Sequence, residues 1–180
     1  GCMSKILFLM RYPLDEPDNL RRKFDGQMAA VRALGHEAVF FGWNREGVWL
    51  CGEGRRELVR RCPLACAPGY AHTLLHVDLL EALKAVAPKE RFDLVYMRFL
   101  RAFGNAPSAL LTAKESGAKL VVEHPTYPFA NGKKDNLLRK PVFAYLDRVF
   151  ARVNPLVDLY TLIGEPANGV LDGRPAMNIV

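Results

Sequence analysis

Short, continuous apolar runs alternate with amphipathic segments along the chain. Runs without interspersed polar residues are typical of parallel strands that are covered on both faces. The runs that predict strands are Ile6–Met10, Ala38–Phe41, Leu94–Met97, Leu120–Val122 and Leu159–Ile163. Strands that alternate with helices predict an α/β fold, here a Rossmann-like three-layer domain with a mainly parallel sheet.

Glycines mark the ends of two predicted helices. One helical pattern runs from Phe24 to Leu34 and stops at Gly35, and a second covers Pro107–Ser116 and stops at Gly117. Glycine readily adopts the left-handed conformation that ends a helix. Further amphipathic stretches predict two more helices, at Ala71–Val86 and Pro141–Val153. The segment from Gly42 to Gly69 does not follow this alternation, and we expect a small β excursion there.

The composition is that of one globular domain, which we assign to residues 4–180. Of the 180 residues, 50% are hydrophobic and 24% are charged, which excludes a disordered chain. The 25 Lys and Arg exceed the 19 Asp and Glu by six, and this excess is spread along the sequence. An even spread favours weak attraction to anionic ligands or membranes, so we expect no nucleic-acid partner.

The sequence also bears on the location of the protein. The longest uncharged run, Cys62 to Val77, contains two prolines and cannot form a spanning helix. The apolar stretch at Ile6–Met10 is too short for a signal peptide. Cysteine spacing suggests no disulfide framework, and we therefore expect a cytoplasmic protein.

Candidate site residues follow the predicted strands. In an open parallel sheet, ligands bind beyond the carboxyl ends of the strands. The residues at those ends are Arg11, Tyr12, Arg98, Glu123, His124 and Tyr127. Arg11 and Arg98 can clamp a phosphate or carboxylate, because guanidinium groups make paired hydrogen bonds to such anions. Alternatively, both arginines lie at the surface and pair with Asp15 or Glu16.

Glu123 and His124 are the candidates for the chemistry. They can act as a base or contact sugar hydroxyls, and Tyr127 belongs to a stiff aromatic loop suited to stacking on a sugar ring. The alternatives are that His124 is a satisfied loop residue, that Glu123 pairs with a nearby lysine, and that the loop around Tyr127 is a packed turn.

Several cofactor motifs are absent or incomplete. The loop after the first strand has no glycine until Gly26, so a dinucleotide fingerprint is missing, and no phosphate-binding Gly-x-x-x-x-Gly-Lys sequence occurs. Cys51, Cys62, Cys66 and His72 match no usual zinc spacing. We therefore expect no metal and no cofactor bound by this domain.

The predicted helix at Pro141–Val153 combines an apolar stripe with basic residues. Its apolar positions recur at helical spacing, and the neighbouring basic residues are Lys133, Lys134, Arg139, Lys140, Arg148 and Arg152. Such a helix can lie on an anionic membrane, which would place the protein at the inner face of the membrane. The alternative is that the stripe is core and the charges form a solvated face.

Four segments of the sequence resemble a known family. Lys5–Met10 with Ala33–Val39 is similar to the N-terminal domain of GT-B glycosyltransferases of family 4, and Gly117–Phe129 resembles a segment of bacterial members that build surface polysaccharides. Gly173–Val180 resembles the strand that leads into the interdomain linker of that family. The resemblance covers nearly the whole chain.

The resemblance implies the acceptor-binding half of a retaining hexosyltransferase. In the family, a C-terminal domain binds the nucleotide diphosphate sugar and carries two glutamates seven residues apart. That domain is absent from this sequence, so we expect the chain alone to be inactive. The implied partner is an acceptor sugar or glycan, either free or linked to a lipid. The loop Arg11–Asn19 lacks the family's glycine pair, and this departs from the family's contact with donor phosphate.

A non-catalytic module that binds a phosphorylated small molecule is the alternative, and an NAD-dependent oxidoreductase or epimerase is disfavoured by the missing fingerprint.

Overall fold

A computed structural model describes residues 2–98, 104–124, 140–162 and 169–178. The helices are α1 (Asn19–Ala33), α2 (Leu74–Glu90), α3 (Ala106–Glu115) and α4 (Lys140–Val153). The strands are β1 (Lys5–Pro13), β2 (Glu37–Trp43), β3 (Gly47–Gly52), β4 (Arg55–Arg61), β5 (Leu94–Arg98), β6 (Lys119–His124), β7 (Leu159–Leu162), β8 (Val170–Leu171) and β9 (Arg174–Asn178). Short 3-10 turns are η1 (Tyr70–His72) and η3 (Asn154–Leu156).

The described strands form one mostly parallel sheet in the order β4-β3-β2-β1-β5-β6-β7-β9-β8. β1 pairs in parallel with β2 on one side and with β5 on the other. The parallel arrangement continues through β6, β7 and β9, whereas β3, β4 and β8 pair antiparallel at the edges. The order of strands therefore reverses between β1 and β5, which is the position where such sheets bind ligands.

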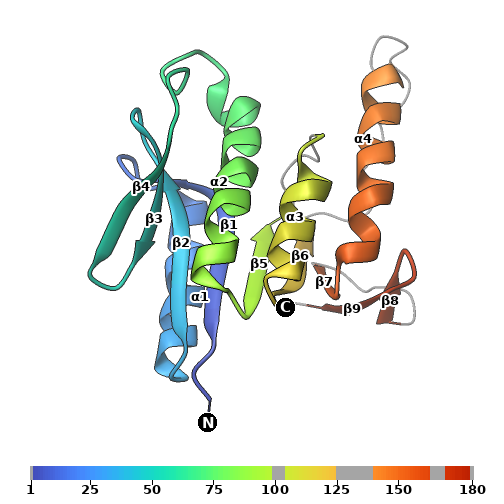
Figure 1. The fold of residues 1–180 in the computed structure, drawn as a ribbon, viewed down its shortest axis with the longest axis horizontal. Coiled ribbons are helices and arrows are strands. Elements are labelled where there is room, and N and C mark those ends of the chain that lie inside the picture. The colour runs from blue at the N-terminus through green and yellow to red at the C-terminus, as the bar shows by residue number, and fades with distance from the viewer. Residues whose placement is uncertain (1, 99–103, 125–139, 163–168, 179–180) are drawn as a thin grey trace.

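The helices form layers on both faces of the sheet. α2, α3 and α4 lie on one face and α1 on the other (Figure 1). Each face has its own hydrophobic cluster: Leu7 and Leu9 of β1 belong to the cluster under α2 and α3, and Phe8 and Met10 to the cluster under α1. Alternate residues of a strand point to opposite faces, so one strand contributes to both clusters. The fold is α/β, as the sequence predicts.

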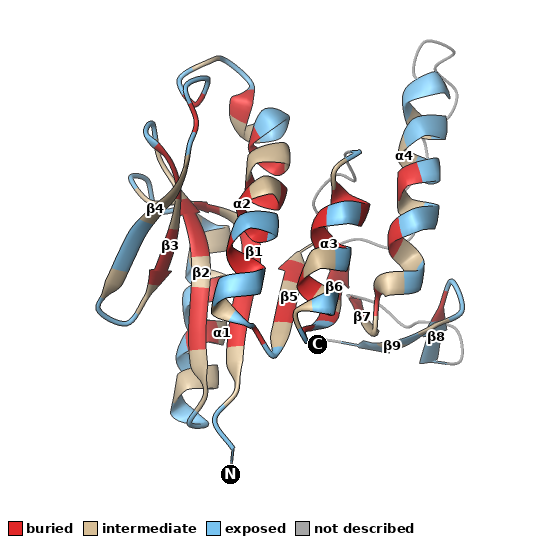
Figure 2. Ribbon diagram, viewed as in Figure 1, coloured by how far each residue is buried: buried red, intermediate tan, exposed pale blue. Residues whose placement is uncertain are grey.

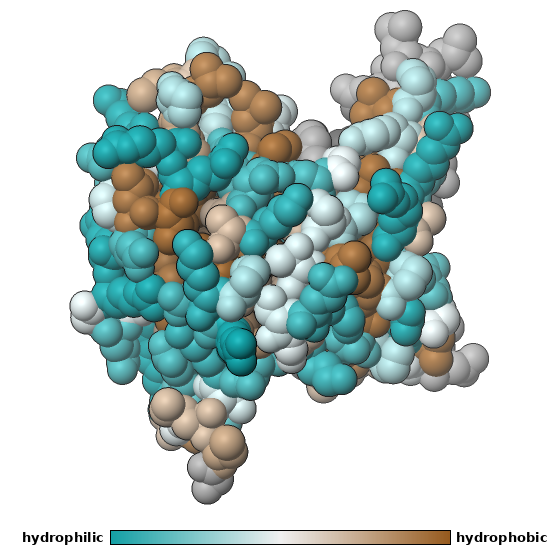
Figure 3. Space-filling model, in the orientation of Figure 1, coloured by the Kyte–Doolittle hydropathy of each residue, from teal (hydrophilic) through white to brown (hydrophobic). Residues whose placement is uncertain are grey.

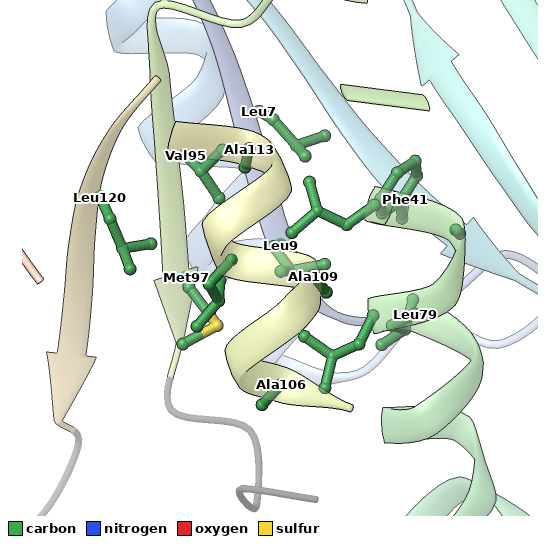
Figure 4. Packing of buried hydrophobic residues seen from close by; sticks show 14 of the residues in the cluster. Leu7, Leu9, Phe41, Leu79, Val95, Met97, Ala106, Ala109, Ala113 and Leu120 are labelled. Carbon is green, nitrogen blue, oxygen red and sulfur yellow. The ribbon is translucent and has the colours of Figure 1, made fainter. Parts of the chain in front are cut away.

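Small residues bring α3 close to the sheet. Ala106, Ala109 and Ala113 of α3 face strand residues that include Val95 and Met97 in the core (Figure 4). Alanine side chains leave room for a close helix–sheet approach, and the strands fill the remaining space with larger side chains. Buried residues are concentrated in the central strands and in α2 and α3, whereas α4 is exposed along most of its length (Figure 2).

Local signals in the sequence explain where the helices begin and end. The Asp18 side chain accepts a hydrogen bond from the backbone N–H of Arg21 at 2.7 Å and caps the start of α1. Gly35 and Gly117 adopt positive φ angles of 85° and 104°, each one residue beyond the capping residue of α1 or α3, which confirms the predicted stops. The helix predicted from Ala71 begins instead at Leu74, because the chain first forms the η1 turn.

The segment between β2 and α2 extends the sheet. β3 and β4 form an antiparallel hairpin that pairs with β2, so the predicted β excursion is part of the main sheet. This hairpin places Val48 and Leu50 in the core under α2. β4 is the edge strand, and its consecutive residues Arg56 and Glu57 are both exposed, as expected at a solvated edge.

Candidate functional site

Glu123 lies at the centre of a cluster of polar side chains at the carboxyl ends of β5 and β6. Its side chain is fully buried, with 0% exposure. Tyr96 donates a hydrogen bond from its hydroxyl to Glu123 Oε2 at 2.5 Å, and Lys23 of α1 pairs with Oε1. Arg98 Nη1 lies 3.8 Å from Oε1. A buried carboxylate is costly unless it is paired and hydrogen-bonded, and these contacts supply both. We call Lys23, Tyr96, Arg98 and Glu123 the Glu123 cluster.

The register of the sheet builds this cluster. Glu123 pairs with Arg98 across β5 and β6 and with Thr161 across β6 and β7. Tyr96 precedes Arg98 by two residues, so both side chains point to the face that α1 covers. Lys23 reaches the same face from the second turn of α1. Three separate elements, α1, β5 and β6, therefore position the side chains of the cluster.

Burial and the bond to Glu123 keep Tyr96 protonated. Burial is the larger cause and the hydrogen bond to the carboxylate the next, and together they raise the pKa of Tyr96 to about 12. The neighbouring side chains of Thr161 and Gln27 act in the opposite direction. At neutral pH the phenol is a hydrogen-bond donor and cannot act as a base.

Two buried polar atoms border the cluster. Thr161 Oγ1 and Gln27 Oε1 make no hydrogen bond that meets ordinary geometry within the described ranges. Thr161 faces Glu123 across the sheet and is 4% exposed, and Gln27 lies one helical turn after Lys23. Buried polar groups in folded proteins nearly always have a partner, so these two atoms mark a place where a polar ligand group would be stabilised.

His124 lies on the opposite face of the sheet from Glu123. Its ring stacks on Tyr160 with centroids 5.0 Å apart and lies 6.4 Å from the Phe150 ring of α4. Burial lowers the pKa of His124 to about 4, so the imidazole is neutral at neutral pH. This environment is the aromatic core between the sheet and α4.

Arg11 and Tyr12 are likewise separated by the alternation of the strand. Arg11 Nη1 lies 2.9 Å from Nδ1 of His72, on the side of α2. Tyr12 lies on the α1 face, where its hydroxyl donates to Asp25 Oδ1 at 2.7 Å and the Arg21 guanidinium lies 5.0 Å from its ring centre. Burial, followed by the bond to Asp25, raises the pKa of Tyr12 to about 12.

The structure therefore divides the candidate residues. It places Arg98 beside Glu123, and it places Arg11 and His124 on the other face. Tyr12 shares the face of Glu123 but bonds to Asp25. Tyr127 lies outside the described residues. The pairing of Glu123 with a lysine, which the sequence left open, is present, and the lysine is Lys23.

Three side chains of this region were not among the candidates. Tyr96 and Thr161 occupy strand interiors, and Lys23 is one of several charged residues in a helix. The period of two along the strands would have indicated Tyr96, because it shares a face with Arg98. No pattern in the sequence distinguishes Lys23 from its neighbours Arg21 and Arg22.

The thiols do not form a metal centre. Cys51 and Cys62 are buried free thiols, Cys66 is an exposed one, and burial raises the pKa of Cys51 and of Cys62. Within the ranges that the structure describes, no group of three or more His, Cys, Asp or Glu side chains could hold a metal ion. The Glu123 cluster itself contains one carboxylate and two cations, which is not a set of metal ligands.

α4 exposes part of its apolar stripe. Val149 and Val153 are buried, but Val142 is 56% and Tyr145 is 47% exposed. The first turns of α4 rise beyond the end of α3 (Figure 1), and hydrophobic surface appears there among hydrophilic residues (Figure 3). None of the helices in the described part of the chain has both the length and the apolar character to cross a membrane.

Comparisons with known proteins leave the family open. No protein-family model matches the sequence, and no curated protein matches it either.

Proposed function

We propose that the chain is the acceptor-binding half of a retaining glycosyltransferase. The full enzyme would transfer a sugar from a nucleotide diphosphate sugar to a glycan or lipid-linked acceptor in the synthesis of a surface polysaccharide. The observation that carries the proposal is the Glu123 cluster, which lies at the carboxyl ends of β5 and β6, next to the reversal of strand order. The resemblance of Gly117–Phe129 to such enzymes points to the same strand.

The cluster offers groups that suit an acceptor. Lys23 and Arg98 are partly exposed and can donate hydrogen bonds to a ligand, whereas Glu123 lies beneath them, paired with Lys23 and 3.8 Å from Arg98. Retaining transfer requires that the acceptor hydroxyl be held close to the anomeric carbon of the donor. In this proposal the described domain supplies that position, and a second domain supplies the donor and most of the charge stabilisation.

The proposal gives α4 a role in reaching a lipid-linked acceptor. Its exposed apolar residues lie beside Lys140, Arg148 and Arg152, which favour an anionic bilayer surface. The helix would then rest on the inner face of the membrane, and the domain would remain peripheral.

Ligand-detected NMR with the chain tests the proposal. Saturation transfer from the protein to short glycans, measured with the wild type and with Arg98→Ala, reports binding at the cluster. We expect transfer to at least one glycan with the wild type and about tenfold weaker binding with Arg98→Ala, because charged hydrogen bonds to sugars and anions are the stronger ones. An equal signal with both proteins, or no glycan binding while a phosphorylated small molecule binds, would favour the non-catalytic module.

A further inference from the structure

The Glu123 cluster carries more positive than negative charge. Lys23 and Arg98 contribute two cations, and Glu123 contributes one anion. The nearest further carboxylate on α1, Asp25, already accepts the Tyr12 hydroxyl and lies 3.9 Å from Arg21. One positive charge at the carboxyl edge of the sheet is therefore not neutralised by these side chains.

The hydrogen-bond donors of the cluster are also in excess. Arg98 has five N–H donors, but the closest carboxylate oxygen among the described residues, on Glu123, is 3.8 Å away, which is too far for a hydrogen bond. Lys23 has three N–H donors, and Glu123 accepts one of them. Each oxygen of Glu123 accepts one hydrogen bond, from Tyr96 and from Lys23, and the 3.8 Å distance leaves the donors of Arg98 without a hydrogen bond to this carboxylate.

The two cations face outward and the carboxylate does not. The side chains of Lys23 and Arg98 are 35% and 26% exposed, whereas that of Glu123 is fully buried. An incoming group therefore meets the cations first. Thr161, across the sheet from Glu123, adds a buried hydroxyl that makes no hydrogen bond of ordinary geometry in the described part of the chain, although it lies close enough to the Tyr96 hydroxyl to lower the pKa of that group. The cluster thus has unused donors, and Thr161 borders it with a weakly bonded hydroxyl.

We infer that the Glu123 cluster binds a phosphate group, with Arg98 and Lys23 as its main ligands and Thr161 at the inner edge. Phosphate carries about −1.5 to −2 charges at neutral pH and three acceptor oxygens. The planar guanidinium of Arg98 can donate to two of them, and the ammonium of Lys23 adds a point charge. Glu123 is then a positioning residue, because it fixes the two cations.

This inference rests on the proposed function and narrows it. The acceptor becomes a phosphorylated molecule, either a soluble sugar phosphate or a glycan linked to a lipid through phosphate. Both sources present anionic phosphate oxygens next to a sugar, as a monoester in the soluble molecule and as a diester or diphosphate in the lipid-linked one. The proposed function alone is equally compatible with a neutral acceptor.

Amide NMR titration with methyl phosphate tests the inference without any assumption about the sugar. We expect saturable shifts at Lys23, Arg98 and Thr161 with a dissociation constant on the order of 1 mM, as for a small ligand with few contacts. Arg98→Gln should weaken binding about tenfold and Thr161→Val about fivefold. Arg22→Gln is the matched control, because Arg22 is an exposed neighbour of Lys23 on α1 that lies outside the cluster.

The source of the phosphate is resolved by two further ligands. Tighter binding of a hexose 1-phosphate than of methyl phosphate indicates a soluble sugar phosphate. Sedimentation of the wild type, but not of Arg98→Gln, with vesicles that contain a prenyl phosphate indicates a lipid-linked acceptor. Arg98→Lys keeps the charge and loses the paired geometry, so its intermediate affinity would separate charge from geometry should Arg98→Gln be too unstable to measure.

Two results would overturn the inference. Methyl phosphate that causes no saturable shift at the cluster, or that binds Arg98→Gln and Arg22→Gln equally well, means that the cluster is no phosphate site. Binding of a neutral methyl hexoside at the same residues would then retain the proposed function and reject the phosphate. Conversely, the chain could bind phosphate at the cluster while the full-length protein transfers no sugar. That result would support the phosphate site and contradict the proposed transferase function.

Discussion

Glu123 and His124 are consecutive residues of β6 whose side chains lie on opposite faces of the sheet. Glu123 accepts the Tyr96 hydroxyl bond at 2.5 Å on the α1 face, and His124 stacks on Tyr160 under α4. A ligand at the Glu123 cluster is separated from the His124 ring by the sheet itself. The two residues therefore do not act on one substrate group in this conformation.

The first prediction follows from this separation. His124→Phe should leave the affinity for ligands of the Glu123 cluster within about twofold of the wild type, because the change keeps an aromatic ring against Tyr160 on the far face. Arg98→Ala should weaken the same affinity about tenfold. Isothermal titration with the best glycan or phosphate ligand measures both. Loss of binding in His124→Phe would place the imidazole in the site.

The second prediction concerns acid stability. Burial lowers the pKa of His124 from 6.5 to about 4, so the unfolded chain binds this proton at a higher pH than the folded protein. The free energy of unfolding should therefore fall as the pH drops from about 6.5 to about 4, by a total of about 3 kcal/mol. His124→Phe should remove most of this slope in urea titrations across that interval.

A second group titrates in a lower interval and serves as the control. The hydrogen bond from Arg55, with further contributions from Lys5, lowers the pKa of Glu90 from 4.5 to about 2. The stabilisation from Glu90 is thus present above pH 4.5 and is lost as the pH falls towards 2. Glu90→Gln should flatten the curve only below pH 4.5. A slope between pH 6.5 and 4 that survives in His124→Phe would contradict the assignment.

The third prediction isolates the ion pair between Lys23 and Glu123. Lys23→Met leaves a buried carboxylate with Tyr96 and a distant Arg98, and we expect a loss of about 2 kcal/mol in the free energy of unfolding, reduced by the partial exposure of the lysine. The double variant Lys23→Met/Glu123→Gln should recover most of it, because no buried charge remains. Urea denaturation of all four proteins gives the coupling free energy.

Arg22→Met is the matched control for this cycle. Arg22 is exposed and adjacent to Lys23, so its removal should change stability by less than about 0.5 kcal/mol. Strict additivity of Lys23→Met and Glu123→Gln would show that the two charges do not interact in solution.

The sequence predicted the layers of the fold more fully than the site. Continuous apolar runs such as Leu120–Val122 indicate buried parallel strands, and Gly35 and Gly117 end helices because they adopt positive φ angles. These signals are local, so they can be seen without the tertiary structure. The order of the strands, which places β1 between β2 and β5, depends on long-range pairing that no local pattern records.

Only part of the site was predicted from the sequence. Strand ends can be recognised from the local sequence, whereas the partners of a side chain cannot. Arg98 and Glu123 both follow from their position at strand ends, and the sheet brings them together. The period of two in a strand would have separated Glu123 from His124 and Arg11 from Tyr12. Lys23 could not be predicted, because its position depends on how α1 docks on the sheet. The amphipathic pattern of α1 predicts which face of the helix is buried, but not which residues that face contacts.

The fourth prediction concerns α4 and the membrane. Val142→Glu with Lys140→Glu changes an exposed apolar residue and a neighbouring cation, and it should reduce sedimentation with anionic vesicles at least about fivefold. Leu34→Glu is the control, since Leu34 is also an exposed apolar residue, with 76% exposure, but it follows α1 and does not belong to α4. Equal binding by both variants would mean that α4 does not contact the bilayer. High salt should weaken wild-type binding, because the attraction is partly electrostatic.

The fifth prediction compares two glycines in different surroundings. Gly47 begins β3 with a φ of +154°, and a Cβ there would lie 1.9 Å from the Arg60 carbonyl oxygen of β4. That atom belongs to the backbone of a paired strand and cannot rotate away. Gly47→Ala should therefore lower the free energy of unfolding by about 3 kcal/mol.

Gly26 provides the opposite case within the same chain. It lies in the middle of α1, and a Cβ there would meet nothing within 4 Å. Gly26→Ala should stabilise the protein by about 0.5–1 kcal/mol, because alanine loses less conformational entropy in a helix. Urea denaturation of the two variants measures both effects with the same substitution. A stable Gly47→Ala protein would contradict the close pairing of β3 with β4, and a destabilised Gly26→Ala protein would contradict the open surroundings of α1 at this position.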